Sequence, residues 1–342
     1  MLTKLLGNNQ IKDAFKQMLA KQRVPRSLLF AGENGVGKKQ FAFELAKAFS
    51  CQNPVDFEAC DLCSACKRAT KFDFPTSTEK KDNDKIFFSE HADVAIIRKA
   101  GKFITVNQIR ELETEANFRP YEGKARFFII DDADKMNEQA SNALLKTLEE
   151  PAATTYIFLI TSRPMSLLQT IRSRCQTIRF ALINAGEIEH FLLADGKVSQ
   201  DDAQLLARLS LGSIGRARSL DLDKFRDQRD KMIKVLHGIY KQNRAVLLRT
   251  TEEICDAKLK DDYENYLIIL QTLIHDVWSL KNGAENVVNV DVGSQLRGLA
   301  NAFTSKSLAN SITEIETLRE NLTVNINKKI ATDNLFLKMA NF

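Results

Sequence analysis

The chain has 342 residues, of which 44% are hydrophobic and 27% are charged, the balance of an ordinary globular protein. This length predicts two or three domains, and a net charge of +5 permits contact with nucleic acid without arguing for it. No apolar run approaches the roughly 18 residues that span a bilayer, and Lys4, Asn8 and Asn9 interrupt the start of the chain where a signal peptide would be apolar. We therefore expect a cytoplasmic protein with no membrane partner.

The segment from Gly32 to Lys39 (GENGVGKK) has the spacing of a phosphate-binding loop at every position but the last. In that motif backbone N–H groups surround the phosphates, the lysine (here Lys38) reaches the β- and γ-phosphates, and a final Ser or Thr holds Mg²⁺. Lys39 instead brings a cation and no oxygen ligand. An apolar run at 27–31 and a helical pattern at 40–49 predict the strand–loop–helix arrangement that directs a helix N-terminus at an anion. The candidate nucleotide-binding residues of the loop are Gly32, Gly35, Val36, Gly37, Lys38 and Lys39.

Four of the six cysteines lie close together, with the spacing C-x8-C-x2-C-x2-C: Cys51, Cys60, Cys63 and Cys66. Thiolates two residues apart can share one tetrahedral Zn²⁺, and a cytosolic chain is not expected to hold disulfides there. We predict a closed structural zinc site with no open position for catalysis. Four thiolates alone do not exclude an iron–sulfur cluster.

Two further apolar runs predict strands that end in polar residues. The run 127–130 is followed by Asp131 and Asp132, in the manner of a Walker B strand whose first carboxylate holds Mg²⁺ and whose second acid polarises the attacking water. Asp132 is one methylene shorter than the usual Glu. The run 156–160 is followed by Thr161, which could sense the γ-phosphate. With a helix predicted at 104–116, between the run 27–31 and the run 127–130, these strands indicate a parallel α/β sheet.

The rest of the chain lacks strand signals past about residue 182. Short helices are predicted at 187–193, 200–211 and 215–220, and long amphipathic stretches follow at 223–255, 260–281 and 305–340. Leu270, Leu273, Ile274, Val277 and Trp278 are predicted core positions of a helical bundle. The expected domains are 1–181, containing the cysteine segment 51–66 and a polar loop or insertion at 73–90, then 182–222, then 223–342.

Several segments together resemble the AAA+ clamp-loader family. Residues 140–151 (ASNALLKTLEEP) and Ser173-Arg174-Cys175 resemble its signature, and a zinc knuckle just after the phosphate-loop helix is similar to the bacterial branch. Residues 104–110 (ITVNQIR) and 325–339 resemble the delta-prime branch. The resemblance runs essentially end to end, apart from the insertion at 73–90.

The resemblance implies a RecA-like AAA+ module, a small helical lid and a helical collar, assembled with gamma/tau and delta subunits in a five-membered ring. That ring opens the sliding clamp and loads it onto primed DNA, and DNA-directed DNA polymerase (nucleotidyltransferase) activity belongs to the DNA polymerase III holoenzyme. Arg174 would act as an arginine finger in the ATP site of the adjacent gamma/tau subunit. Such a contact can be worth about 10³–10⁵ in rate.

Three departures from the motor subunits fall in one predicted site. Lys39 replaces the Ser or Thr, Asp132 replaces the Glu, and Arg216 is displaced by one residue from the lid arginine of the Gly-Ser-Met-Arg pattern. We expect weak or absent ATP hydrolysis and no dependable Mg²⁺ site, while binding of ATP or ADP stays open. The Lys39 ammonium is expected to pair with Asp131 or with the phosphates. The alternatives are an ATP-hydrolysing gamma/tau-type subunit and a stand-alone AAA+ ATPase of recombination or helicase loading.

Overall fold

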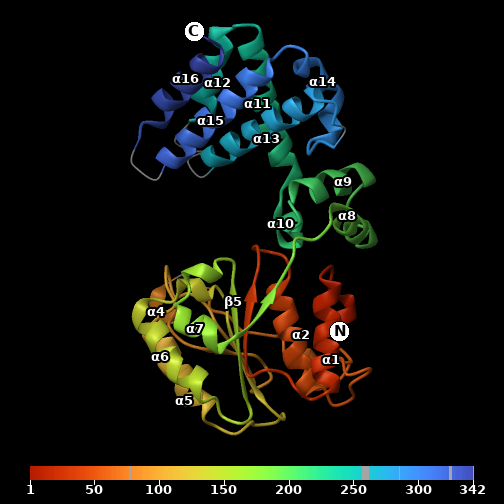
Figure 1. Ribbon diagram of the computed structural model, residues 1–342, viewed down its shortest axis with the longest axis vertical. Coiled ribbons are helices and arrows are strands. Elements are labelled where there is room, and N and C mark those ends of the chain that lie inside the picture. The colour runs from red at the N-terminus through yellow and green to blue at the C-terminus, as the bar shows by residue number, and fades with distance from the viewer. Residues whose placement is uncertain (77–78, 256–261, 285, 323–325, 342) are drawn as a thin grey trace. The chain divides into compact units, whose positions relative to one another are not determined.

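A six-stranded sheet forms the centre of the first half of the chain in the computed structural model, which describes residues 1–76, 79–255, 262–284, 286–322 and 326–341 (Figure 1). The strands are β1 (Ser27–Ala31), β2 (Phe87–Phe88), β3 (Val94–Ile97), β4 (Arg126–Ile130), β5 (Thr155–Thr161) and β6 (Gln176–Arg179), in the order β2-β3-β4-β5-β1-β6. The three predicted strands are confirmed as β1, β4 and β5. The expectation of a wholly parallel sheet is wrong at one edge, where β2 pairs with β3 in the antiparallel direction.

Helices cover both faces of the sheet (Figure 1). Phe127 and Ile129 of β4 face the side packed by α1 (Asn9–Ala20) and α2 (Lys38–Ser50), whereas Phe128 and Ile130 face the opposite side. The opposite face is packed by α5 (Val106–Ala116), α6 (Glu138–Glu149) and α7 (Gln169–Arg174). Strands buried on both faces read as continuous apolar runs, which is why β1, β4 and β5 were predicted from the sequence, whereas the equally buried β3 was not.

Shorter elements connect these layers: η1 (Leu2–Lys4), α3 (Ser64–Arg68), α4 (Lys80–Asn83), η2 (Ala133–Lys135) and η3 (Pro164–Ser166). The expectation of a polar loop throughout 73–90 is wrong in its second half. That half contains α4 and β2, and the side chains of Ile86 and Phe87 are buried. Ser77 and Thr78 of the same segment lie outside the described residues.

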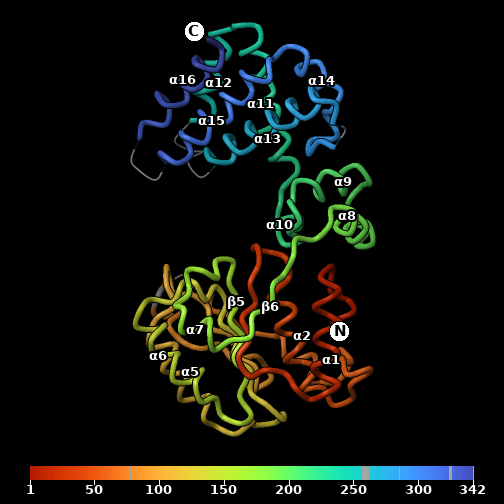
Figure 2. The backbone as a smooth tube through the Cα atoms, in the orientation of Figure 1, coloured from red at the N-terminus to blue at the C-terminus, as the bar shows by residue number. Residues whose placement is uncertain are grey.

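The remainder of the described chain is helical (Figure 2). The elements are α8 (Ala185–Ala194), α9 (Gln200–Leu209), α10 (Ile214–Ser219), α11 (Leu222–Tyr240), α12 (Arg244–Ile254), α13 (Tyr263–Lys281), η5 (Val290–Val292), α14 (Gly293–Ala300), α15 (Ser305–Asn321) and α16 (Lys328–Met339). The three short helices are confirmed, whereas 223–255 is two helices separated by a turn at Gln242, where φ is +49°. Helix α14 was not predicted. Residues 260, 261 and 323–325, which fell in the predicted segments 260–281 and 305–340, lie outside the described residues.

Helix α13 is central to the helical core. Leu270, Leu273, Ile274 and Val277 are fully buried, as predicted, but Trp278 is 41% exposed. Trp278 follows Val277 by about 100° around the helix, which carries its ring to the edge of the apolar stripe. The prediction of Trp278 as a core residue is therefore wrong.

Packing divides the chain into two compact units, Met1–Phe191 with Leu211–Arg216, and Leu192–Ser210 with Ala217–Phe342. This spatial grouping brings the short segment 211–216 into the unit that contains the sheet. The expected α/β domain followed by an all-helical part is confirmed, and the finer division into three domains stays a prediction. Among the described residues, no helix combines the length and apolar character that crossing a membrane requires.

Candidate functional site

The carboxyl ends of β1, β4 and β5 meet at one edge of the sheet, because the three strands are parallel neighbours. Each predicted motif follows one of these ends: the glycine loop after β1, the two aspartates after β4 and Thr161 at the end of β5. Together they enclose a cavity of about 260 Å³. Its lining is Asn34, Gly35, Gly37, Lys38, Lys39, Gln40, Asp131, Asp132, Ile160, Thr161 and Ser162. The structure thus brings together most of the residues that the sequence singled out.

The backbone of the loop needs its glycines. Gly35 and Gly37 have φ values of +77° and +100°, in the left-handed region that favours glycine. Gly37 is the N-cap of α2, so the first N–H groups of that helix point toward the cavity edge. The Val36 side chain between the two glycines is fully buried and anchors the loop to the core.

The Lys38 side chain forms hydrogen bonds with the backbone of its own loop. Its Nζ donates to the carbonyl oxygens of Gly32 at 2.6 Å and Glu33 at 2.7 Å, and the residue is 5% exposed. Burial lowers the pKa of Lys38, against the opposing effect of nearby carboxylates such as Asp131. The side chain that the motif directs at phosphates therefore lines the cavity while held by two carbonyls.

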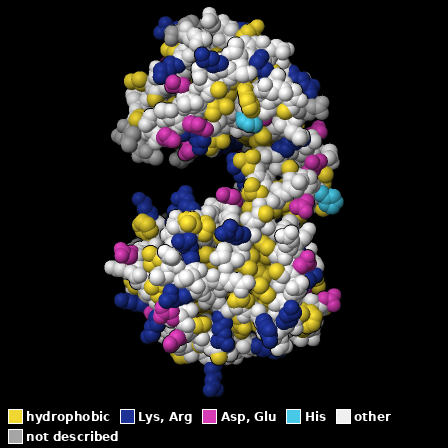
Figure 3. All heavy atoms as spheres, viewed as in Figure 1, with side chains coloured by type: hydrophobic (Ala, Val, Ile, Leu, Met, Phe, Trp, Pro, Cys, Tyr) yellow, Lys and Arg dark blue, Asp and Glu magenta, His cyan; other side chains and the backbone are white. Residues whose placement is uncertain are grey.

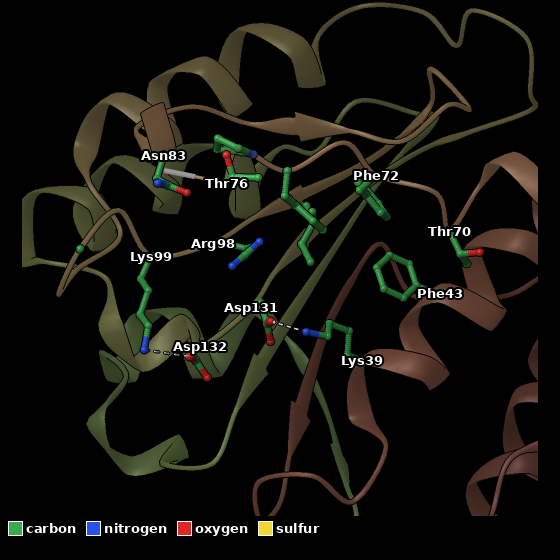
Figure 4. A pocket seen from close by; sticks show the side chains of 14 residues that line it. Lys39, Phe43, Thr70, Phe72, Thr76, Asn83, Arg98, Lys99, Asp131 and Asp132 are labelled. Atoms are coloured by element: carbon green, nitrogen blue, oxygen red, sulfur yellow. Dashed lines mark hydrogen bonds and ion pairs between the residues drawn. The ribbon is translucent and has the colours of Figure 1, made fainter. Parts of the chain in front are cut away.

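Lys39 contacts the acid that would hold a metal. Its Nζ lies 2.9 Å from Oδ2 of Asp131, the ion pair that a dashed line marks in Figure 4, and both residues are in the cavity lining given above. Lys39 is in the first turn of α2, where a metal-binding loop carries a hydroxyl. The expected pairing of Lys39 with Asp131 is present in the structure. An ammonium group thus lies against the carboxylate at the position where Mg²⁺ would bind.

The second acid and the threonine have other partners. Asp132 has φ +55° and a side chain 45% exposed, and its Oδ2 lies 4.0 Å from Nζ of Lys99. Thr161 donates its hydroxyl to Oδ1 of Asp134 at 2.6 Å and accepts the Arg163 N–H at 2.9 Å. The sequence analysis missed Asp134 and Lys99. The run Asp131-Asp132-Ala133-Asp134 was the available signal for the former, and nothing local distinguished Lys99 from a surface lysine.

Segment 211–216 packs directly on the loop. The Gly215 N–H donates to the Gly35 carbonyl at 2.9 Å. A Cβ placed on Gly215 would lie 2.9 Å from Gly35 Cα, and one placed on Gly35 would lie 2.3 Å from Ser213 Oγ. Arg216, in α10, is not among the described residues that line the cavity. The glycine that precedes Arg216 thus occupies the place of closest contact.

Arg174 lies at the end of α7, outside the cavity lining given above. Its guanidinium contacts Oε1 of Glu149 at 2.5 Å and donates to the Thr170 carbonyl at 2.9 Å. The side chain is 33% exposed. The structure therefore does not bring Arg174 to the phosphate loop of its own chain.

The four clustered cysteines converge, with their Sγ atoms all within 4.8 Å of one another. Tetrahedral Zn²⁺ with Zn–S bonds of about 2.3 Å separates sulfurs by about 3.8 Å, close to the 4.0 Å between the sulfurs of Cys60 and Cys66. Cys63 donates its backbone N–H to Cys60 Sγ at 3.3 Å, and this bond with that from Leu62 lowers the pKa of Cys60. Such N–H groups favour the thiolate that a metal needs. The donor set of Cys51, Cys60, Cys63 and Cys66 fits a metal ion.

Comparison with known proteins gives matches to DNA polymerase III subunits over most of the chain. A family model described as "DNA polymerase III, delta subunit" matches residues 7–184, and one described as "DNA polymerase III, delta subunit, C terminal" matches residues 224–340. The DNA polymerase III subunit delta' of Bacillus subtilis (strain 168) is 30% identical over 324 residues, covering 94% of this chain and 92% of that protein. The subunit delta' of Escherichia coli (strain K12) is 27% identical, covering 97% and 95%.

Tau subunits are similar over a shorter region. The DNA polymerase III subunit tau of Salmonella typhimurium is 28% identical over 221 residues, covering 63% of this chain and 32% of that protein. The delta' match extends through the helical part and fits the resemblance of residues 104–110 to that branch. The chain therefore belongs to the DNA polymerase III delta' family of clamp-loader subunits.

Proposed function

We propose that this chain is the rigid, non-hydrolysing subunit of a clamp loader. It assembles in the cytoplasm with gamma/tau and delta subunits, and through that complex it helps place the sliding clamp on primed DNA. The observation that carries the non-hydrolysing role is the 2.9 Å contact between Lys39 and Asp131. Membership of the delta' family supports the assembly.

The Lys39–Asp131 contact acts against metal binding. Mg²⁺ requires near-octahedral oxygen ligands at 2.0–2.1 Å, and here the hydroxyl ligand is missing and the carboxylate is neutralised by an ammonium group. Asp132 lacks the reach of a Glu and lies nearer Lys99. A nucleotide bound at this site would be held by the loop and by Lys38 and Lys39 without being turned over.

The order of the strands supports an AAA+ module. Strand β5 separates the loop-bearing β1 from the Asp131-bearing β4, so the cavity spans three neighbouring strand ends. We assign 1–181 to this module, 182–222 to a helical lid and 223–342 to a collar that binds neighbouring subunits. The direct contact of Gly215 with Gly35 ties the lid segment to the loop.

Arg174 is assigned as an arginine finger that acts on a neighbouring chain. Its place at the exposed end of α7 and its absence from the lining of this chain's cavity support the assignment. Glu149 holds the guanidinium in an exposed ion pair, which a phosphate group can replace because both are anionic acceptors for a bidentate arginine. The four thiolates are assigned to one structural Zn²⁺, with no coordination position left for catalysis.

The face drawn in Figure 3 interleaves Lys and Arg with acidic and apolar side chains, and shows no single continuous basic surface among the described residues. The proposed role reaches DNA through the assembled complex and assigns no DNA-contacting residue to this chain.

The test is steady-state ATP turnover by the purified, zinc-replete chain, with and without primed DNA, and then mixed with gamma and delta subunits. We expect no turnover by the chain alone and increased turnover in the mixture. A Lys38→Ala variant measures the background of the chain alone. DNA-stimulated turnover by the chain alone that Lys38→Ala abolishes would replace this proposal with the gamma/tau-type motor.

A further inference from the structure

A second cavity, of about 600 Å³, lies beside the phosphate cavity on the β3 side of Asp131 (Figure 4). It is formed by the side chains of α2, the end of β3 and the segment that follows the cysteine cluster. Its volume falls within the roughly 300–1,000 Å³ of small-molecule sites. Lys39, Asp131 and Asp132 line both cavities, but the remaining walls differ.

One wall of this second cavity is a row of aromatic rings. The centroids of Phe43 and Phe72 are 5.5 Å apart, and Phe72 stacks on Phe74 at 5.5 Å with an interplanar angle of 11°. The Arg98 guanidinium continues the row, with its central carbon 4.4 Å from the Phe74 centroid. The three rings are only partly buried, so each leaves part of its surface open. A planar group can stack against such a wall.

The rest of the cavity carries charged side chains, beginning with Arg98 where the aromatic row ends. Figure 4 shows Arg98 in the middle of the cavity, between Phe43 and Phe72 on one side and Lys99 with Asp132 on the other. Lys39 is paired with Asp131, and Lys99 lies 4.0 Å from Asp132. Within the described ranges, Arg98 forms no ion pair with a carboxylate. The cavity therefore holds one guanidinium whose charge is not offset, next to an ammonium whose ion pair is long.

We propose that this cavity binds a nucleoside mono- or diphosphate, separately from the phosphate loop. The base stacks on the Phe72 ring, and Phe43, whose ring is tilted by 44° to that of Phe72, contacts the base at its edge. The phosphate accepts hydrogen bonds from Arg98 and Lys99. A guanidinium suits this role because its planar donor fork matches phosphate oxygens. A ligand with a planar ring at one end and negative charge at the other fits the aromatic and cationic sides.

The test is photolabelling of the full chain with 8-azido-ADP, followed by mapping of the labelled peptides and by competition with unlabelled ADP. We expect label on the 70–76 segment, protected by ADP, in both the wild type and Lys38→Ala. Arg98→Gln is expected to weaken the ADP protection by about tenfold, as the loss of a charge-assisted hydrogen bond predicts. Phe72→Leu should weaken it as well while keeping an apolar side chain.

Lys102→Gln is the matched control, because it removes the same charge from an exposed position just past the cavity and should leave labelling unchanged. Label confined to the phosphate loop, or label on 70–76 that is unaffected by Arg98→Gln, would overturn the proposal. Protection by a short single-stranded oligonucleotide but not by ADP would also overturn it, because the ligand would then be nucleic acid. If Lys38→Ala loses the label on the phosphate loop but keeps the label on 70–76, ligand binding in the second cavity does not depend on the phosphate loop. This inference can then be tested separately from the proposed function.

Discussion

At the scale of one residue, Lys39 changes the chemistry of the cavity at the carboxyl end of β1. The glycines at 35 and 37 adopt the left-handed conformations of a phosphate-binding loop, and Lys38 lines the cavity. Lys39 nevertheless places an ammonium 2.9 Å from Asp131. The charge that a metal would bring is therefore already supplied by the protein.

Replacing Lys39 by Thr should create a dependence on Mg²⁺. We expect the wild type to bind ADP with equal affinity with and without Mg²⁺. Lys39→Thr should bind ADP about tenfold more tightly when Mg²⁺ is present, because its hydroxyl adds an oxygen ligand for the metal. A tenfold change in affinity corresponds to about 1.4 kcal/mol of binding free energy. Calorimetric titration measures both. Lys39→Met, which removes the charge without adding an oxygen, is the control and should show no Mg²⁺ dependence. A strong Mg²⁺ requirement in the wild type would contradict the proposal.

Tyr263 gives a prediction for alkaline pH. Burial raises the pKa of Tyr263 to about 12, and its hydroxyl lies 2.6 Å from Thr332 Oγ1. The unfolded state loses this proton near pH 10 and the folded state only near pH 12, so the stabilisation is fully present below pH 10 and is lost as the pH rises to 12. The free energy of unfolding should fall by about 1.4 kcal/mol per pH unit in that range relative to Tyr263→Phe. Urea unfolding at several pH values measures the free energy of unfolding of both proteins. If it has the same pH dependence in the wild type and in Tyr263→Phe, the prediction is refuted.

At the scale of elements, segment 211–216 and the glycine loop 32–39 contact each other through their backbones. Gly215 and Gly35 approach so closely that neither position has room for a side chain in this arrangement. In the sequence, Arg216 is displaced by one residue from the arginine position of the Gly-Ser-Met-Arg pattern. In the structure, the residue before it, Gly215, contacts Gly35 of the loop. The displacement therefore also lets segment 211–216 pack on the loop.

Gly215→Ala should separate the two segments. Its Cβ would lie 2.9 Å from backbone atoms of Gly35, which cannot move like a flexible side chain, so we expect a loss of about 1–3 kcal/mol in stability. Gly298→Ala in α14 is the matched control, because nothing lies within 4 Å of its Cβ and alanine favours a helix. Urea unfolding should show destabilisation at position 215 only. Equal stability of the two variants would show that the contact is not tight.

Removing the metal should affect the cysteine segment and the protein around it. The cysteine segment 51–66 has non-glycine residues with positive φ at Asp56, Phe57 and Asp61, a conformation that a metal can hold in place. We expect one mole of zinc per mole of chain, and a lower Tm after chelation or in Cys63→Ser. Cys255→Ser, outside the cluster, should keep its zinc and serves as the control. A protein that is purified without zinc and is equally stable would rule out the site.

At the scale of the whole molecule, Arg174 lies outside the lining of the chain's own cavity. It is held at the end of α7 by Glu149 and by the Thr170 carbonyl, with a third of its side chain exposed. Its proposed role requires a neighbouring chain. The effect of replacing it is therefore measurable only in the assembled complex.

Arg174→Ala should depress ATP turnover of a reconstituted loader while assembly survives. An arginine finger is worth about 10³–10⁵ in rate, so turnover at the neighbouring site should be almost abolished, with a matching loss of clamp loading. Arg172→Ala, two residues away on α7, is the control and should leave turnover near normal. Size-exclusion chromatography checks assembly. Unchanged turnover in Arg174→Ala would remove this residue from the site.

The predicted strands have continuous apolar runs, such as 127–130, but the sequence analysis missed the buried run 94–97 of β3, which has the same signal. Strand β6 was missed because it is an edge strand whose residues are mostly exposed, and β2 because two residues carry no period. The sequence analysis predicted Trp278 as a core residue because helical spacing gives the direction of a side chain only to within about 100°, the rotation from one helical residue to the next. The loop, the aspartates and the cysteine cluster were found because their chemistry depends on spacing along the chain.

The sequence by itself determined the strand–loop–helix motif, the altered metal position at Lys39, the four-cysteine cluster and the order of an α/β part followed by helices. These depend on local spacing and apolar period, which a linear chain displays directly. Only the tertiary structure decided that Lys39 contacts Asp131, that Gly215 packs on Gly35, and that Phe43, Phe72 and Arg98 surround one cavity. These contacts join segments far apart in the chain, and strand order and packing fix them where no local pattern can.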